Sequence, residues 1–152
     1  MTPAQIRAAT ILEKATQVQE MLAGIHGLPL ASLREFRSDA RNPAAAESYL
    51  RRALEGLLDL GRHMLAKGFG RGPVEYKEIA VGLVRVGVLD AACGELLMEL
   101  AGYRNRLVHF YDEIAEQELY EICSGQLGDI ESVLGALLRW AREHPESVDG
   151  TL

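Results

Sequence analysis

The densest group of polar side chains able to do chemistry lies at residues 103–112, which read Tyr-Arg-Asn-Arg-Leu-Val-His-Phe-Tyr-Asp. His109 can accept or donate a proton near neutral pH. Arg104 keeps its charge and presents a planar fork of N–H groups that suits a phosphate. RNA carries its own nucleophile, the 2′-hydroxyl, so its cleavage needs only proton transfer and positive charge beside the phosphate. Groups of these two kinds would therefore be enough for RNA cleavage, and a metal ion or other cofactor is not strictly required.

The spacing of these residues limits how one copy of the chain can use them. In a straight helix Arg104 and Tyr111 are seven residues apart and nearly eclipsed. Arg104 and His109 are separated by about 140° around the helix axis. Either the helix ends or bends near His109, or a second copy completes the site across a two-fold axis. A symmetric dimer would supply one base and one acid from different subunits.

Helical spacing of apolar residues runs through most of the chain and provides the frame for this motif. Thr2 and Gln5 form a capping-box pattern, which predicts a first helix from Pro3 to about Gly24. Asn42 followed by proline predicts a second, long helix to about Lys67. Further helices are expected at about 74–84, 90–107 and 117–143, with a short helical turn near 30–36. Asp90 is expected to cap the helix at 90–107.

These elements predict an all-α fold, an antiparallel up-and-down bundle of four to five helices. The length of 152 residues fits one domain, which we place at 1–145, followed by a flexible tail at 146–152. The helix at 90–107 is apolar on more than one side, so its second side could meet a partner subunit. Its main seam is expected at Leu96, Leu100, Tyr103 and Leu107, with Leu97, Ala101 and Val108 off that seam.

Composition and charge exclude several classes of protein. The formal net charge of −6 argues against a general nucleic-acid coat, which is usually basic, but not against one small basic site. Cys93 and Cys123 lie in no CxxC pair and are interpreted as buried thiols in a reducing cytosol. No apolar run is long enough to span a membrane and no signal peptide is evident, so we expect a cytoplasmic protein.

Other charged and glycine-rich segments have two interpretations each. Arg51 and Arg52 are most simply a solvated face, but they and Arg106 could also contact RNA beside the motif. The glycine-rich stretch 68–73 lacks the lysine, hydroxyl and preceding strand of a phosphate-binding loop, so we interpret it as a helix connection. The other histidines have no metal-ligand spacing and are interpreted as structural; they are His26, His63 and His144.

The pattern Arg-x4-His-x-Tyr, at the end of the penultimate long helix of a small all-α protein, resembles the HepT branch of the HEPN superfamily. All four residues of the family's motif are present at the family's spacing: Arg104, Asn105, His109 and Tyr111. Segments 45–63 and 76–90 are similar to the helices that precede the motif in that family. The best match is 102–114, and 119–122 continues it.

This resemblance implies a metal-independent endoribonuclease toxin that works as a homodimer and cleaves RNA, not DNA, in a cleft at the dimer interface. Its partner would be a minimal nucleotidyltransferase that acts as the antitoxin. Arg104 and His109 would be catalytic, Asn105 a supporting polar residue, and Tyr111 the acceptor when the partner transfers AMP. The alternative is a non-catalytic helical module that binds a nucleotidyltransferase, which the acidic net charge slightly favours.

Overall fold

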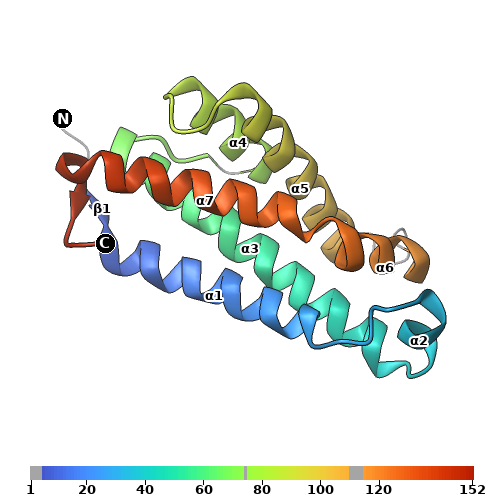
Figure 1. Ribbon diagram of the computed structural model, residues 1–152. Helices are drawn as coiled ribbons and strands as arrows, with labels where there is room; N and C mark the ends of the chain where they lie inside the picture. Colours follow the sequence, from blue (N-terminus) through green and yellow to red (C-terminus); the bar gives the residue numbers. More distant parts are fainter. Residues whose placement is uncertain (1–4, 74, 110–114) are drawn as a thin grey trace.

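The protein is a bundle of α-helices, shown in Figure 1 as a computed structural model that describes residues 5–73, 75–109 and 115–152, His109 by its backbone alone. The described residues form seven α-helices, one 3-10 helix and two very short strands, joined by loops. The expectation of an all-α fold is confirmed. The elements are β1 (Ile6–Arg7), α1 (Ala8–His26), α2 (Leu33–Arg37), α3 (Arg41–Phe69), α4 (Tyr76–Arg85), α5 (Ala91–His109), α6 (Glu116–Gly125), α7 (Leu127–Glu143), the 3-10 helix (Pro145–Ser147) and β2 (Val148–Asp149).

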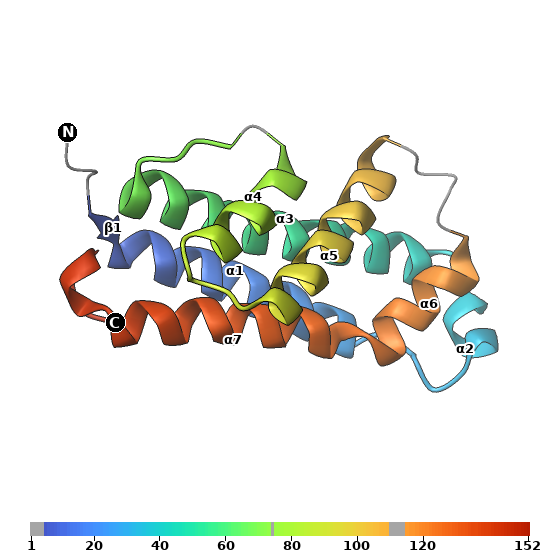
Figure 2. The same cartoon turned by 90° about the horizontal axis from the view of Figure 1, so that it is seen from above.

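The long helices α1, α3 and α7 run along the length of the molecule, with α1 antiparallel to α3 (Figure 1). Helices α4 and α5 form a hairpin that lies over α3 and α7, as Figure 2 shows from above. The core is apolar, since no polar or charged residue among those described is fully buried. No described helix is long and apolar enough to cross a membrane.

The first helix differs from its prediction at both ends. It begins at Ala8, because Ile6 pairs with Val148 in the parallel β1–β2 ladder and extends the chain; Thr2 and Pro3 lie outside the described residues. It continues past Gly24 to His26. Gly24 serves packing rather than termination: a Cβ there would lie 2.7 Å from the ring of Tyr49.

The remaining boundaries follow local chemistry. Helix α3 ends at Phe69, two residues beyond the predicted end at about Lys67, and Gly70 after it forms a left-handed cap with a φ of 67°. Asp90 Oδ1 accepts a hydrogen bond of 2.8 Å from the Cys93 amide, so Asp90 caps α5 as predicted. The predicted helix 117–143 is two helices, α6 and α7, which meet at Gln126.

The apolar seam of α5 is rotated from its prediction. Leu97 and Ala101, which were expected off the seam, are fully buried, whereas Leu96 and Tyr103 are only partly buried. The reason is that α5 packs against α3 and α7 as well as α4. The C-terminal segment, expected to be flexible, also contributes to the core, because Val148 is buried in its pairing with β1.

Candidate active site

Arg104 lies on the side of α5 that faces the rest of the bundle. Leu97, seven residues earlier, and Leu107, three residues later, share its helical face and are buried. The Arg104 side chain is accordingly only 18% exposed. Because a buried charge is costly unless it is paired and hydrogen-bonded, the surroundings of this guanidinium have to supply partners.

Three groups from three helices contact the Arg104 guanidinium. Nη2 lies 3.5 Å from Glu55 Oε1 on α3, and Nη1 donates to Asn105 Oδ1 at 3.4 Å. The guanidinium carbon lies 4.5 Å from the centre of the Tyr76 ring on α4, within the range of a cation–π contact. Arg104 Nε is buried and has no hydrogen-bond partner among the described residues. The guanidinium is thus placed by its neighbours without being saturated by them.

Tyr76 is itself held by α3. Its hydroxyl donates to Asp59 Oδ1 at 3.4 Å, and the Arg62 guanidinium carbon lies 4.9 Å from its ring centre. Burial, with a further contribution from Asp59, raises the pKa of Tyr76 above its usual value. The phenol therefore stays protonated over the physiological range and remains a donor to Asp59.

Four charged residues of α3 form one stripe beneath this site. Arg51, Glu55, Asp59 and Arg62 are spaced by four, four and three residues, which places them on one helical face. Within the stripe Arg51 Nη1 lies 3.3 Å from Glu55 Oε1, and Arg62 Nη1 lies 3.3 Å from Asp59 Oδ1. Sequence reasoning identified Arg51 but missed the other three, although their i, i+4, i+8, i+11 spacing was a usable signal.

The basic residues predicted to contact RNA lie in different settings. Arg51 shares the Glu55 carboxylate with Arg104 and so belongs to the site. Arg52 is exposed, and among the described residues no ion pair joins it to this cluster. Arg106 forms a two-pronged ion pair with Glu118 of α6, both contacts 2.8 Å long, which lowers the pKa of that carboxyl.

The structure describes the histidine of the motif by its backbone and does not describe the tyrosine. His109 is the last residue of α5, and its backbone position is one helical turn beyond Asn105. Tyr111, the predicted AMP acceptor, and Phe110 before it lie outside the described residues. Of the other histidines, His63 accepts a hydrogen bond from the Arg7 amide at 3.0 Å. Among the described residues no three His, Cys, Asp or Glu side chains are grouped as metal ligands.

Comparison with known proteins decides the family. The sequence matches the family described as ribonuclease HepT-like over residues 10–137, which is most of the chain and includes Arg104, Asn105 and His109. The protein belongs to the HepT-like family. This confirms the resemblance inferred from the motif. No curated protein sequence matches the chain significantly.

Solved structures share the fold of this HepT-like chain at low sequence identity. One is a tri-AMPylated Shewanella oneidensis HEPN toxin in complex with MNT antitoxin, with a TM-score of 0.76, 18% identity and coverage of 86% of this chain and 97% of that one. A second is a toxin–antitoxin structure with AMP-PNP: TM-score 0.75, 17% identity, 84% and 97% coverage. A third is YutE of Bacillus subtilis, a cytosolic protein of unknown function: TM-score 0.74, 20% identity, 90% and 91% coverage.

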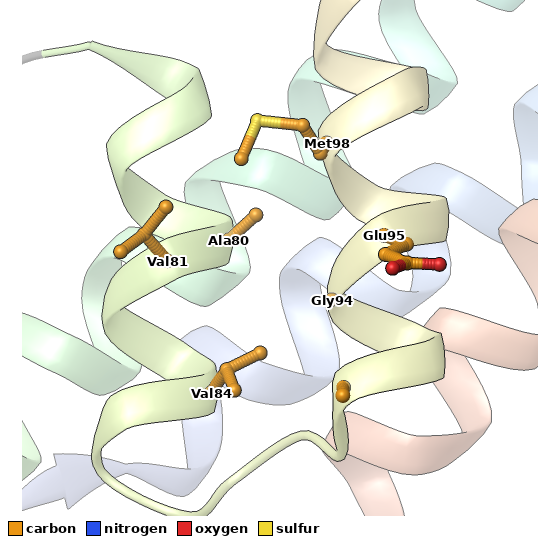
Figure 3. A pocket seen from close by; sticks show the side chains of 7 residues that line it. Ala80, Val81, Val84, Gly94, Glu95 and Met98 are labelled. Carbon is orange, nitrogen blue, oxygen red and sulfur yellow. The ribbon is translucent and has the colours of Figure 1, made fainter.

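The HepT-like fold also presents an apolar pocket of about 370 Å³ between α4 and α5, shown in Figure 3. Its walls are Ala80, Val81, Val84, Ala91, Gly94, Glu95 and Met98. Val81 is 44% exposed, unusual for a large apolar side chain in this molecule. From Met98 the same face of α5 continues in steps of four and three residues through Gly102 and Asn105 toward position 109. The pocket therefore lies along the same stripe of α5 as Asn105 and position 109, whereas Arg104 lies about 120° around the helix, on the core-facing side.

Proposed function

We propose that this HepT-like protein is a metal-independent endoribonuclease toxin of a HEPN/nucleotidyltransferase toxin–antitoxin system. The observation that carries the proposal is Arg104, a largely buried guanidinium that residues of three helices contact, about one and a half helical turns before His109. Membership of the ribonuclease HepT-like family supports the same reaction. Structures of the same fold are described as toxins bound to antitoxins, one of them a HEPN toxin with an MNT antitoxin.

The proposed reaction uses the RNA 2′-hydroxyl as nucleophile. His109 accepts the 2′-hydroxyl proton as that oxygen attacks the adjacent phosphorus. The Arg104 guanidinium stabilises the extra negative charge on the phosphorus oxygens. The bond to the 5′-oxygen then breaks, and that oxygen takes a proton from a second imidazole, the His109 of another subunit. The products are a 2′,3′-cyclic phosphate and a free 5′-hydroxyl.

The second imidazole requires a homodimer, and the α4–α5 pocket is the surface we assign to it. The pocket is apolar, and its α5 wall continues toward Asn105 and position 109, so a second copy seated there would bring two motif ends together. Val81→Glu should shift the protein from dimer to monomer in sedimentation equilibrium. Leu12→Glu is the matched control, because Leu12 is an equally exposed apolar residue on α1. A dimer that persists in the Val81 variant would contradict this assignment.

The nuclease itself is tested by incubating the purified protein with total bacterial RNA. Arg104→Ala and His109→Ala should each reduce the cleavage rate by about a hundredfold or more, since each removes a group that acts in the transition state. Arg142→Ala, an exposed arginine on α7, should cleave like the wild type. If the wild type binds a nucleotidyltransferase but cleaves no RNA, the alternative of a non-catalytic binding module holds instead.

Control by the partner is proposed to act through Tyr111. Transfer of AMP to this tyrosine would place a phosphate close to the motif, neutralising charge meant for RNA and blocking access. Co-expression with the nucleotidyltransferase, followed by peptide mass spectrometry, should find AMP on Tyr111 and lose it in Tyr111→Phe. AMP found only on other residues would contradict this assignment.

A further inference from the structure

Arg104 occupies an unusual place for a group that has to meet a phosphate. It is on the core-facing stripe of α5 rather than on an exposed loop, and its side chain is 18% exposed. A long side chain normally has several rotamers, and each wrong one would withdraw the charge from the reacting phosphate. Something in the fold therefore has to select one orientation of this guanidinium.

Among the described residues outside α5, the carboxylate of Glu55 and the ring of Tyr76 contact this guanidinium. Glu55 Oε1 lies 3.5 Å from Nη2, while the Tyr76 ring centre lies 4.5 Å from the guanidinium carbon. One contact holds one end of the fork, and the other holds its centre. Together they restrict the group far more than either would alone.

The contacts are long enough to orient Arg104 without consuming its charge. Charge-assisted N–H···O contacts are strongest at about 2.7–2.9 Å. The Arg104–Glu55 distance of 3.5 Å is well outside that range, whereas Arg106 and Glu118 meet at 2.8 Å. Glu55 also divides its Oε1 between Arg104 and Arg51. A phosphate oxygen at optimal distance would thus bind Arg104 more strongly than Glu55 does.

Both groups are anchored in turn by the charged stripe of α3. Arg51 lies one helical turn from Glu55 and forms an ion pair with it, and Asp59 accepts a hydrogen bond from the Tyr76 hydroxyl. The helix that carries these anchors, α3, is the longest in the structure and is buried along its core face. The orientation of Arg104 is therefore fixed by contacts that lead back to a long helix rather than to a loop.

We propose that Glu55 and Tyr76 are positioning residues for Arg104, which hold its guanidinium in the orientation that meets the RNA phosphate. The proposal rests on the nuclease function given above. It assigns no proton transfer to either residue.

The test measures single-turnover cleavage of the RNA species that the wild type degrades fastest in total bacterial RNA, isolated and end-labelled. Tyr76→Leu removes the ring and Tyr76→Phe keeps it. The leucine variant should lower the maximal rate by about tenfold or more, because misplacing a catalytic group is costly. The phenylalanine variant should stay within about threefold of the wild type. In both variants, the protein concentration that gives half of the maximal rate should change less than the maximal rate itself.

Glu55→Gln gives an independent test, with Glu131→Gln on α7 as control because that carboxylate is exposed. The maximal rate should fall about tenfold in the first variant and not in the second. A rate that rises in Glu55→Gln would mean that the carboxylate competes with the phosphate and would overturn the proposal. Equal rates for Tyr76→Leu and Tyr76→Phe would also overturn it, provided that both unfold at similar urea concentrations.

The nuclease function and the positioning role are contradicted by different results. If the wild type cleaves RNA and Arg104→Ala does not, but the Glu55 and Tyr76 variants all match the wild type, only the positioning role is lost. If the wild type cleaves no RNA, the nuclease function is lost first, and the positioning role falls with it.

Discussion

Glu55 Oε1 lies 3.5 Å from Arg104 Nη2, which joins the longest helix of the protein to the arginine of its sequence motif. The same oxygen lies 3.3 Å from Arg51 Nη1. One carboxylate thus serves two guanidinium groups, of which one is an i,i+4 neighbour and the other comes from α5. This arrangement leaves a net positive charge at the site although the whole chain is acidic. It explains how a protein of net charge −6 can offer an anion a local binding point.

Arg104→Lys keeps the charge but should lower RNA cleavage by about tenfold to a hundredfold. The guanidinium divides Nη1 and Nη2 between Asn105 and Glu55, and a single ammonium nitrogen cannot reproduce that fork. The measurement is the initial rate of RNA cleavage, with Arg142→Lys as the control, because that arginine of α7 is exposed and lies outside the cluster. A lysine variant as active as the wild type would mean that charge alone matters at position 104.

Gly94→Ala should destabilise the protein by about 1–3 kcal/mol, as expected for overpacking a tight contact. A Cβ at this position would overlap Val84 Cγ2, so α4 and α5 would have to move apart. The matched control is Gly135→Ala in α7, where a Cβ meets nothing within 4 Å. That variant should gain up to about 1 kcal/mol from higher helix propensity. Urea unfolding of both variants checks the pair, and equal free energies of unfolding would contradict close α4–α5 packing.

Much of the fold could be predicted from the sequence because helical periodicity is strong. The all-α class and the cap at Asp90 both came from local patterns that the structure confirms. Helix ends were less predictable, because a distant contact decided them. Gly24 lies inside α1 since the Tyr49 ring fills the space of a side chain, and no local pattern reports that ring.

Only those residues of the candidate site that are close together in the sequence could be predicted. The motif predicted Arg104, Asn105 and His109 from their spacing, and their roles stay a prediction, although all three lie within the residues that match the family. Glu55 and Tyr76 are 49 and 28 residues earlier and reach Arg104 only through the packing of α3, α4 and α5. Such partners depend on how helices cross, which periodicity in one helix does not specify.

Cys93 should react with iodoacetamide at pH 8 well before Cys123. Burial raises the pKa of the Cys123 thiol to about 12, and the residue is 2% exposed, so it is protonated and shielded from reagent. Burial, with a smaller contribution from Asp90, also raises the pKa of Cys93, but that side chain is only partly buried. Peptide mass spectrometry should find Cys93 alkylated slowly and Cys123 only in urea. Early alkylation of Cys123 in the native protein would be inconsistent with the packing of α6.

His63 should make the protein less stable as the pH falls from about 7 toward 5.5. Burial, followed by the positive charges of Lys67 and Arg7, lowers the pKa of His63 below 6.5 in the folded state. The unfolded chain then binds a proton more readily than the folded one. The stability that neutral His63 contributes is complete above its pKa in the unfolded chain and is lost as the pH falls through its lower pKa in the folded protein. Its neutral Nε2 also accepts the Arg7 amide proton, which a charged imidazole cannot do.

The matched variant is His63→Gln, whose side-chain oxygen can still accept the Arg7 amide but does not titrate. Urea unfolding at pH 7.5, 6.5 and 5.5 should give a steeper decline for the wild type than for the glutamine variant. The difference between the two slopes should stay below about 1.4 kcal/mol per pH unit, which is the contribution of one fully linked proton, because the imidazole is partly solvated. The other histidines are present in both proteins and cancel in the comparison. Parallel declines would show that the folded pKa of His63 is not lowered and that its contact with Arg7 does not link folding to pH.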